Sequence, residues 1–158
     1  MPERRTERKT FRVPRDLKET AEINAFRTGT LTDYFLRGHL VMQQLVALTP
    51  PFNTSRDMIR MKGHLRPMPP LFRFPTTSSA TIYSNINMNL TPQTSAEITA
   101  LTRHLDIPTQ SAYAIAALNL LNGLVSLRDE LAPNETLQFT IARPRRSEPN
   151  PPQSIVIL

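Results

Sequence analysis

The 158-residue chain contains no cysteine and only four glycines. Without cysteine, disulfides, thiolate zinc sites, iron–sulfur clusters and cysteine nucleophiles are excluded. The isolated glycines form no phosphate-cradling loop, and neither a nucleophile elbow nor a paired-carboxylate pattern occurs. The three histidines lie far apart in the sequence, with no carboxylate set beside them. We therefore expect no enzymatic activity, no cofactor and no metal.

Long apolar runs are also missing. The most apolar stretch, residues 112–127, is interrupted by Asn119, Asn122 and Ser126, and residues 1–15 lack the apolar core of a signal peptide. We expect neither a membrane span nor secretion, and a cytoplasmic location.

Acidic side chains are fewer than basic ones, and the basic surplus lies in the first half of the chain. Overall there are 19 Lys and Arg against 13 Asp and Glu, a formal charge of +6. Residues 1–73 carry 14 basic and 7 acidic side chains, whereas residues 74–158 carry 5 and 6. This imbalance indicates a polyanionic partner, either nucleic acid or an anionic membrane surface.

The 15 prolines gather where helical and strand patterns stop, so they divide the chain. The division predicts a basic N-terminal arm (1–8), a first ordered block (9–48) and a proline-rich basic linker (49–80). A second ordered block (81–131) and a C-terminal strand and tail (132–158) follow.

Both blocks show the same order of elements. In the first, alternation over residues 9–13 predicts a strand, residues 15–28 a helix that stops at Gly29, and residues 30–48 a second helix capped by Thr30 or Thr32. In the second, residues 85–90 predict a strand, and residues 92–106 predict a helix that begins with proline. Thr109 or Ser111 is expected to cap the helix that follows. A gapless offset of 77 residues superimposes Phe11 on Met88 and Thr32 on Thr109, which indicates an internal duplication.

The order strand, proline, helix, glycine turn, threonine-capped helix resembles the ribbon-helix-helix family of Arc and MetJ type. The resemblance covers somewhat more than half of the chain, and its second copy has Asp106 where the first has Gly29. In that family two chains pair their strands antiparallel and interlock their helices. The resemblance implies a mostly α fold with a short β-ribbon, in which two units on one chain form an intramolecular pseudo-dimer. A homodimer of two such chains is the alternative.

The family reads double-stranded DNA with a two-stranded ribbon in the major groove, where arginine pairs with guanine and asparagine with adenine. If Phe11 and Val13 face inward, the opposite face of the ribbon carries the expected base-contacting residues, which are Arg8, Thr10, Arg12, Asn85, Asn87 and Asn89. Taken alone, such a polar face is equally typical of the solvated side of a half-buried strand.

Phosphate contacts are expected from the arm and from the start of each second helix, where free N–H groups favour an anion. The candidates are Arg4, Arg5, Lys9, Thr30, Thr32, Thr109 and Ser111. Ordinary helix capping explains the four hydroxyls whether or not DNA binds.

The function expected is sequence-specific binding of double-stranded DNA, as a transcriptional regulator or as an accessory factor in plasmid or conjugative DNA processing. The alternative is a protein-interaction or assembly module whose basic face binds an acidic protein or RNA. In either case the linker or the C-terminal tail could bind a protein partner.

Overall fold

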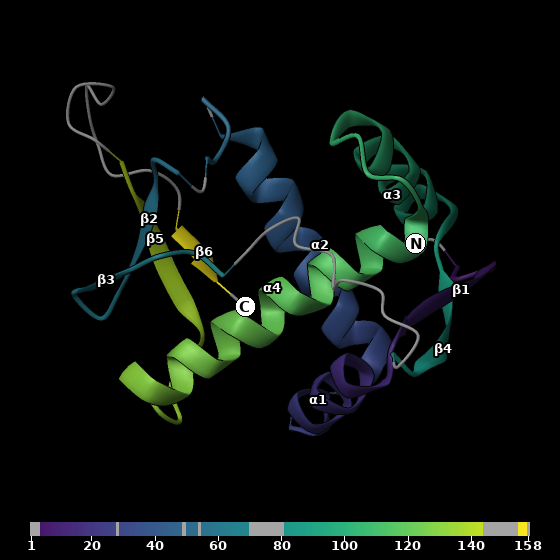
Figure 1. The fold of residues 1–158 in the computed structure, drawn as a ribbon, viewed down its shortest axis with the longest axis horizontal. Coiled ribbons are helices and arrows are strands. Elements are labelled where there is room, and N and C mark those ends of the chain that lie inside the picture. Colours follow the sequence, from purple (N-terminus) through teal and green to yellow (C-terminus); the bar gives the residue numbers. More distant parts are fainter. Residues whose placement is uncertain are drawn as a thin grey trace.

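The computed structural model describes residues 4–27, 29–48, 50–53, 55–69 and 81–143, and the backbone of 155–157. About half of these residues are helical, and the remainder includes two antiparallel sheets, so the fold is mixed α/β rather than mostly α (Figure 1). In chain order the elements are β1 (Glu7–Pro14), α1 (Arg15–Phe26), α2 (Leu31–Ala47), β2 (Met58–Met61), β3 (His64–Arg66), β4 (Tyr83–Leu90), α3 (Pro92–His104), α4 (Gln110–Leu131), β5 (Gln138–Ala142) and β6 (Ile155–Ile157).

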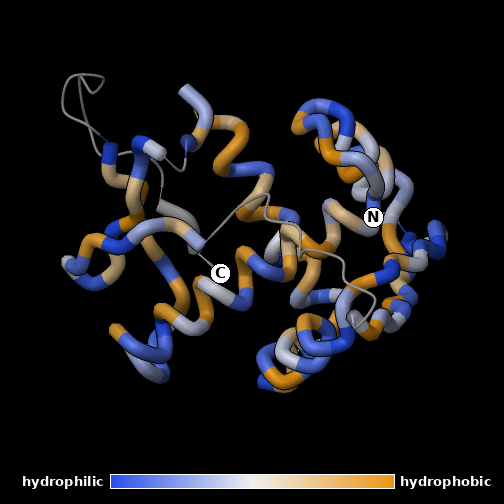
Figure 2. The backbone as a smooth tube through the Cα atoms, viewed as in Figure 1, coloured by the Kyte–Doolittle hydropathy of each residue, from blue (hydrophilic) through white to orange (hydrophobic). Residues whose placement is uncertain are grey.

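The two strands predicted from the sequence pair with each other within one chain. β1 runs antiparallel to β4, with Glu7 opposite Leu90 and Pro14 opposite Tyr83. Apolar and polar residues alternate over residues 10–13 of β1 and 85–90 of β4 (Figure 2), and the apolar ones in these stretches are buried. Phe11 packs against Phe35 of α2 with ring centroids 5.5 Å apart. One face of this two-stranded sheet, which we call the ribbon, therefore covers the helices, and the other faces solvent.

The helix boundaries follow the predicted turn chemistry, with one correction. Thr30 caps α2 and Thr109 caps α4, each accepting a hydrogen bond from a backbone N–H three residues later. The α1–α2 turn passes through Gly29 at φ 142°, and the α3–α4 turn through Asp106 at φ 57°. Because the two caps are 79 residues apart, the predicted superposition of Thr32 on Thr109 is wrong. The offset of 77 holds for the starts of α1 and α3. The change to 79 arises because α3 and the turn after it are each one residue longer than α1 and its turn.

α2 and α4 cross at the centre of the molecule (Figure 1). At the crossing, a Cβ atom on Gly38 would lie 2.9 Å from the backbone oxygen of Ala117. Glycine is needed here because any side chain would push the two helices apart.

A buried histidine joins three helices. His39 lies 2.6 Å from the Tyr113 hydroxyl through Nδ1 and 3.1 Å from Glu97 Oε1 through Nε2. Burial lowers the pKa of His39, although the hydrogen bond to Glu97 opposes the shift. Because a carboxylate only accepts, neutral His39 donates Nε2–H to Glu97 and accepts the Tyr113 proton at Nδ1. The chain of hydrogen bonds links α2, α3 and α4.

Lowering the pH from 7 to 5 should therefore reduce the free energy of unfolding. The unfolded chain binds a proton on His39 near its ordinary pKa of about 6.5, while the folded chain resists protonation until a lower pH. Stability is then lost as the pH falls through this window, by at most about 1.4 kcal/mol per pH unit. Urea denaturation at several pH values measures the slope. A His39→Gln variant that kept the same slope would contradict the assignment.

A second sheet, in the order β3-β2-β5-β6, covers the ends of α2 and α4 that lie away from the ribbon (Figure 1). The β2–β3 hairpin lies inside the segment expected to be a linker, and it turns through Lys62 and Gly63, both at positive φ. β5 is the strand predicted after residue 132. Buried Asp57 anchors the start of β2, since Arg56 pairs with it at 3.0 Å. Burial would raise the pKa of Asp57, but the hydrogen bond from Arg56 leads the contacts that hold it below its ordinary value.

Candidate nucleic-acid interface

The solvent-facing side of the ribbon carries all six residues predicted to contact bases. Each is exposed, and the antiparallel register sets them opposite one another in three pairs, which are Arg8 with Asn89, Thr10 with Asn87, and Arg12 with Asn85. A two-stranded ribbon of this kind has the width to enter a major groove. The structure thus brings the six side chains together on one surface, which we call the outer face.

Two contacts orient side chains on the outer face. The Thr10 hydroxyl donates to Asn87 Oδ1 at 2.7 Å, which leaves the Asn87 amide group free to donate. The Arg12 guanidinium lies 4.5 Å from the centre of the Tyr83 ring, a cation–π contact that holds it at the end of the ribbon. Arginines come only from β1 and the asparagines only from β4, so the outer face is chemically asymmetric.

A carboxylate occupies the N-terminus of α2. Asp33 accepts a bond from the Thr30 backbone N–H while its own N–H donates to the Thr30 hydroxyl, completing a capping box. Arg5 of the arm reaches Asp33 at 3.3 Å. The hydrogen bonds with Thr30, and then Arg5, hold the pKa of Asp33 below its ordinary value. This negative charge opposes a phosphate at the same helix end.

The N-terminus of α4 lacks an acidic residue in its first turn. Thr109 Oγ1 accepts from the Ala112 N–H at 3.0 Å, and Ser111 Oγ accepts from the Arg12 N–H at 2.9 Å. The bond from Arg12 fixes this helix end against β1. Both hydroxyls keep a proton to donate, so the α4 end suits a phosphate better than the α2 end does.

The remaining predicted phosphate contacts differ in position. Arg4 is exposed and Thr32 lies in the first turn of α2. Lys9 lies opposite buried Met88 and is half-buried, so it belongs to the helix-facing side of the ribbon and not to the outer face. Sequence reasoning missed Lys18, whose ammonium donates to the backbone oxygen of Asn85 at 3.1 Å. Its position in a helical pattern gave no sign of this contact with the ribbon.

Most cations of the 49–80 segment pair with carboxylates of the chain. Arg56 binds Asp57, Lys62 binds Glu135 at 2.6 Å, and Arg66 lies 3.7 Å from Glu130. Arg73 lies outside the described residues. The paired side chains would have to leave their partners before they could contact a phosphate, so the candidate interface is the ribbon and its flanks.

Comparisons with known proteins found no relative of this chain. No family model matches the chain, and searches of curated proteins and of solved structures find no match. Within the described part of the chain, no three His, Asp or Glu side chains are grouped to hold a metal ion. None of the helices described has the length and apolarity that a bilayer span requires.

Proposed function

We propose that this chain is a sequence-specific binder of double-stranded DNA that inserts the ribbon into the major groove. The observation that carries the proposal is the outer face, where two arginines, three asparagines and a threonine stand in register on an antiparallel ribbon. These side chains offer the donors and acceptors that distinguish base pairs in that groove. The N-terminus of α4 beside the ribbon supplies a place for a backbone phosphate.

We further propose that the two strand-helix-helix units form a ribbon-helix-helix pseudo-dimer within one chain. Two contacts support it, since each joins a residue to its counterpart in the other unit. Thr10 faces Asn87, 77 residues later on the ribbon, and Gly38 meets Ala117, 79 residues later at the helix crossing. In a two-fold dimer a residue meets its own counterpart only on the symmetry axis, so both contacts are of the kind that such a pairing would produce. A monomer mass for the DNA-binding species supports this, whereas an obligate dimer would support the homodimer instead.

Selection of bound duplexes from a random pool tests the function. We expect an enriched site without two-fold symmetry, because a two-fold axis between Thr10 and Asn87 would exchange each arginine of β1 for an asparagine of β4. Affinity for that site should fall steeply with salt, as phosphate contacts release counterions. A transcriptional regulator would find its site upstream of a gene it controls, and an accessory factor of plasmid or conjugative DNA processing would find it near a transfer or replication origin.

The second candidate is a protein-interaction or assembly module, and one surface favours it. Phe26 and Ile23 lie three residues apart on α1 with 89% and 69% of their surface exposed. Apolar groups grouped in this way often mark a protein contact. Two results together would favour this candidate over DNA readout. They are a pool that yields no enriched duplex and an amount of bound DNA that does not change with salt concentration.

The carboxylate at the α2 N-terminus leads to a prediction. Asp33→Asn should raise affinity for duplex DNA about two- to fivefold, because it removes a negative charge worth about 0.3–1 kcal/mol at a helix end while asparagine keeps an oxygen for Thr30. Fluorescence anisotropy with a labelled duplex measures the change. Glu22→Gln, the same charge change on the exposed surface of α1, is the control. Equal gains in both variants would mean that net charge alone acts.

A further inference from the structure

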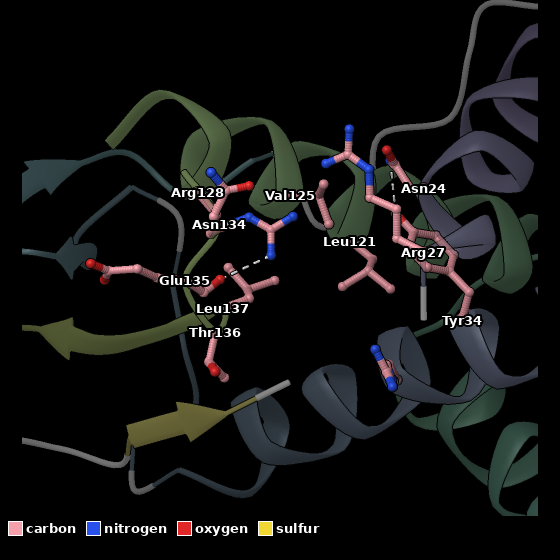
Figure 3. Close-up of a pocket in the computed structure, with 11 residues that line it drawn as sticks. Asn24, Arg27, Tyr34, Leu121, Val125, Arg128, Asn134, Glu135, Thr136 and Leu137 are labelled. Atoms are coloured by element: carbon pink, nitrogen blue, oxygen red, sulfur yellow. Dashed lines mark hydrogen bonds between the residues drawn. The ribbon is translucent and has the colours of Figure 1, made fainter. Parts of the chain in front are cut away.

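A cavity of about 380 Å³ lies between the end of α1, the first half of α2, the second half of α4 and the turn that leads to β5. Three arginines, one from each helix segment, line it: Arg27, Arg37 and Arg128. Tyr34, Leu121 and Val125 form an apolar part of the wall (Figure 3). Its volume is within the range of small-molecule sites.

Two of the three arginines that line the cavity have no carboxylate partner among the described residues. Within the described residues neither Arg27 nor Arg37 has an ion pair, and Glu135, which also lines the cavity, gives its carboxylate to Lys62. Figure 3 shows that carboxylate pointing away from the arginines. Arg128 is fixed by Asp129 at 3.0 Å and by the backbone oxygen of Glu135 at 3.2 Å. Unmatched guanidinium groups at a concave wall attract oxyanions.

The other half of the molecule provides an internal comparison. The offsets of 77 and 79 residues place His104 where the first half has Arg27, and Met42 and Val46 where α4 has Leu121 and Val125. These counterparts line a space of only about 70 Å³, which Phe52 also borders and no arginine lines. The fold by itself therefore does not produce a large basic cavity, and the arginines distinguish one half.

We propose that the cavity is a binding site for a small, multiply charged organic anion, either a phosphate ester or a polycarboxylate. Arg27 and Arg37 hold its oxyanion, Arg128 completes the cationic wall, and Tyr34, Leu121 and Val125 contact its apolar part. The site lies at the end of α1 away from the ribbon, about 18 Å along that 12-residue helix. It is independent of the proposed DNA readout.

Calorimetric titration of the full chain in about 150 mM NaCl, a concentration that screens exposed charges, tests the site. The probes are adenosine monophosphate and inorganic pyrophosphate for phosphates, and citrate for polycarboxylates. We expect one class to bind, and the variant carrying both Arg27→Gln and Arg37→Gln to bind it at least about tenfold more weakly. Arg103→Gln, which removes a single positive charge from the last turn of α3, should bind as the unchanged chain does.

Three results would overturn the proposal. The first is that no probe binds up to about 10 mM, and the second is that Arg103→Gln weakens binding as much as the double variant. The third is a loss of duplex affinity in the double variant beyond that of Arg103→Gln, which would assign the arginines to DNA phosphates. Arg27→Gln alone guards against a folding defect, because Arg27 is exposed and makes no ion pair among the described residues.

Discussion

Arg12→Ala is expected to lower affinity for the selected duplex about 10- to 100-fold. A bidentate contact between arginine and guanine contributes about 1–3 kcal/mol of discrimination, and Arg12 lies exposed on the outer face with its guanidinium positioned by Tyr83. Asn87→Ala should cause a loss of similar size, because it removes the amide at the centre of the ribbon. Competition titrations with the selected duplex and with single-base variants measure both.

A control variant separates the loss of base readout from the loss of positive charge. Arg103→Ala removes the same charge from the end of α3 away from the ribbon, so it should weaken binding only slightly and equally for all sequences. Arg12→Ala should also relax the preference at one base pair, and Asn87→Ala at another. If Arg12→Ala reduced affinity no more than Arg103→Ala, or left base preferences unchanged, the ribbon would not be the reader.

Phe11→Ala should reduce the free energy of unfolding by about 3–5 kcal/mol, a large part of what a domain of this size possesses. Phe11 is 1% exposed, lies on the inner side of the ribbon opposite Ile86, and packs on Phe35. Truncation leaves a cavity between the ribbon and α2 that a two-stranded sheet cannot close without losing its register. Urea denaturation followed by circular dichroism measures the change.

Phe26→Ala is the matched control for this effect. The chemical change is the same, but Phe26 is 89% exposed, so its removal should alter the free energy of unfolding by less than about 0.5 kcal/mol. Similar losses in the two variants would mean that the ribbon does not depend on its apolar face.

The ribbon, its polar face and its four helices were predictable because each depends on a local signal. Alternation over residues 9–13 and 85–90 marks the strands, and threonine before a helical run marks the caps. Thr30 and Thr32 were both candidate caps, and the spacing of three residues from Thr30 to Asp33 is the sequence signal of the capping box that the structure shows. Period two already places Lys9 on the same side of the strand as Phe11 and Val13, so its inward position was predictable although its charge groups it with the arm.

Other features depend on contacts between segments that are distant in the sequence, and no local sequence pattern predicts them. The β2–β3 hairpin is short and lies between prolines, and the other edge of β2 pairs with β5, far along the chain. The basic cavity gathers Arg27, Arg37 and Arg128 only because α2 and α4 cross as they do. In the sequence these arginines are three unrelated surface cations.

The crossing of Gly38 over Ala117 has a consequence for how such a chain assembles. If the two halves were separate polypeptides, two first halves would set glycine against glycine and leave a gap the size of a methyl group. Two second halves would press alanine on alanine, and a Cβ placed at the Gly38 position would lie 2.9 Å from a backbone oxygen. Only unlike halves would fit closely, so this one pair of residues would favour contact between the two different halves over contact between identical ones.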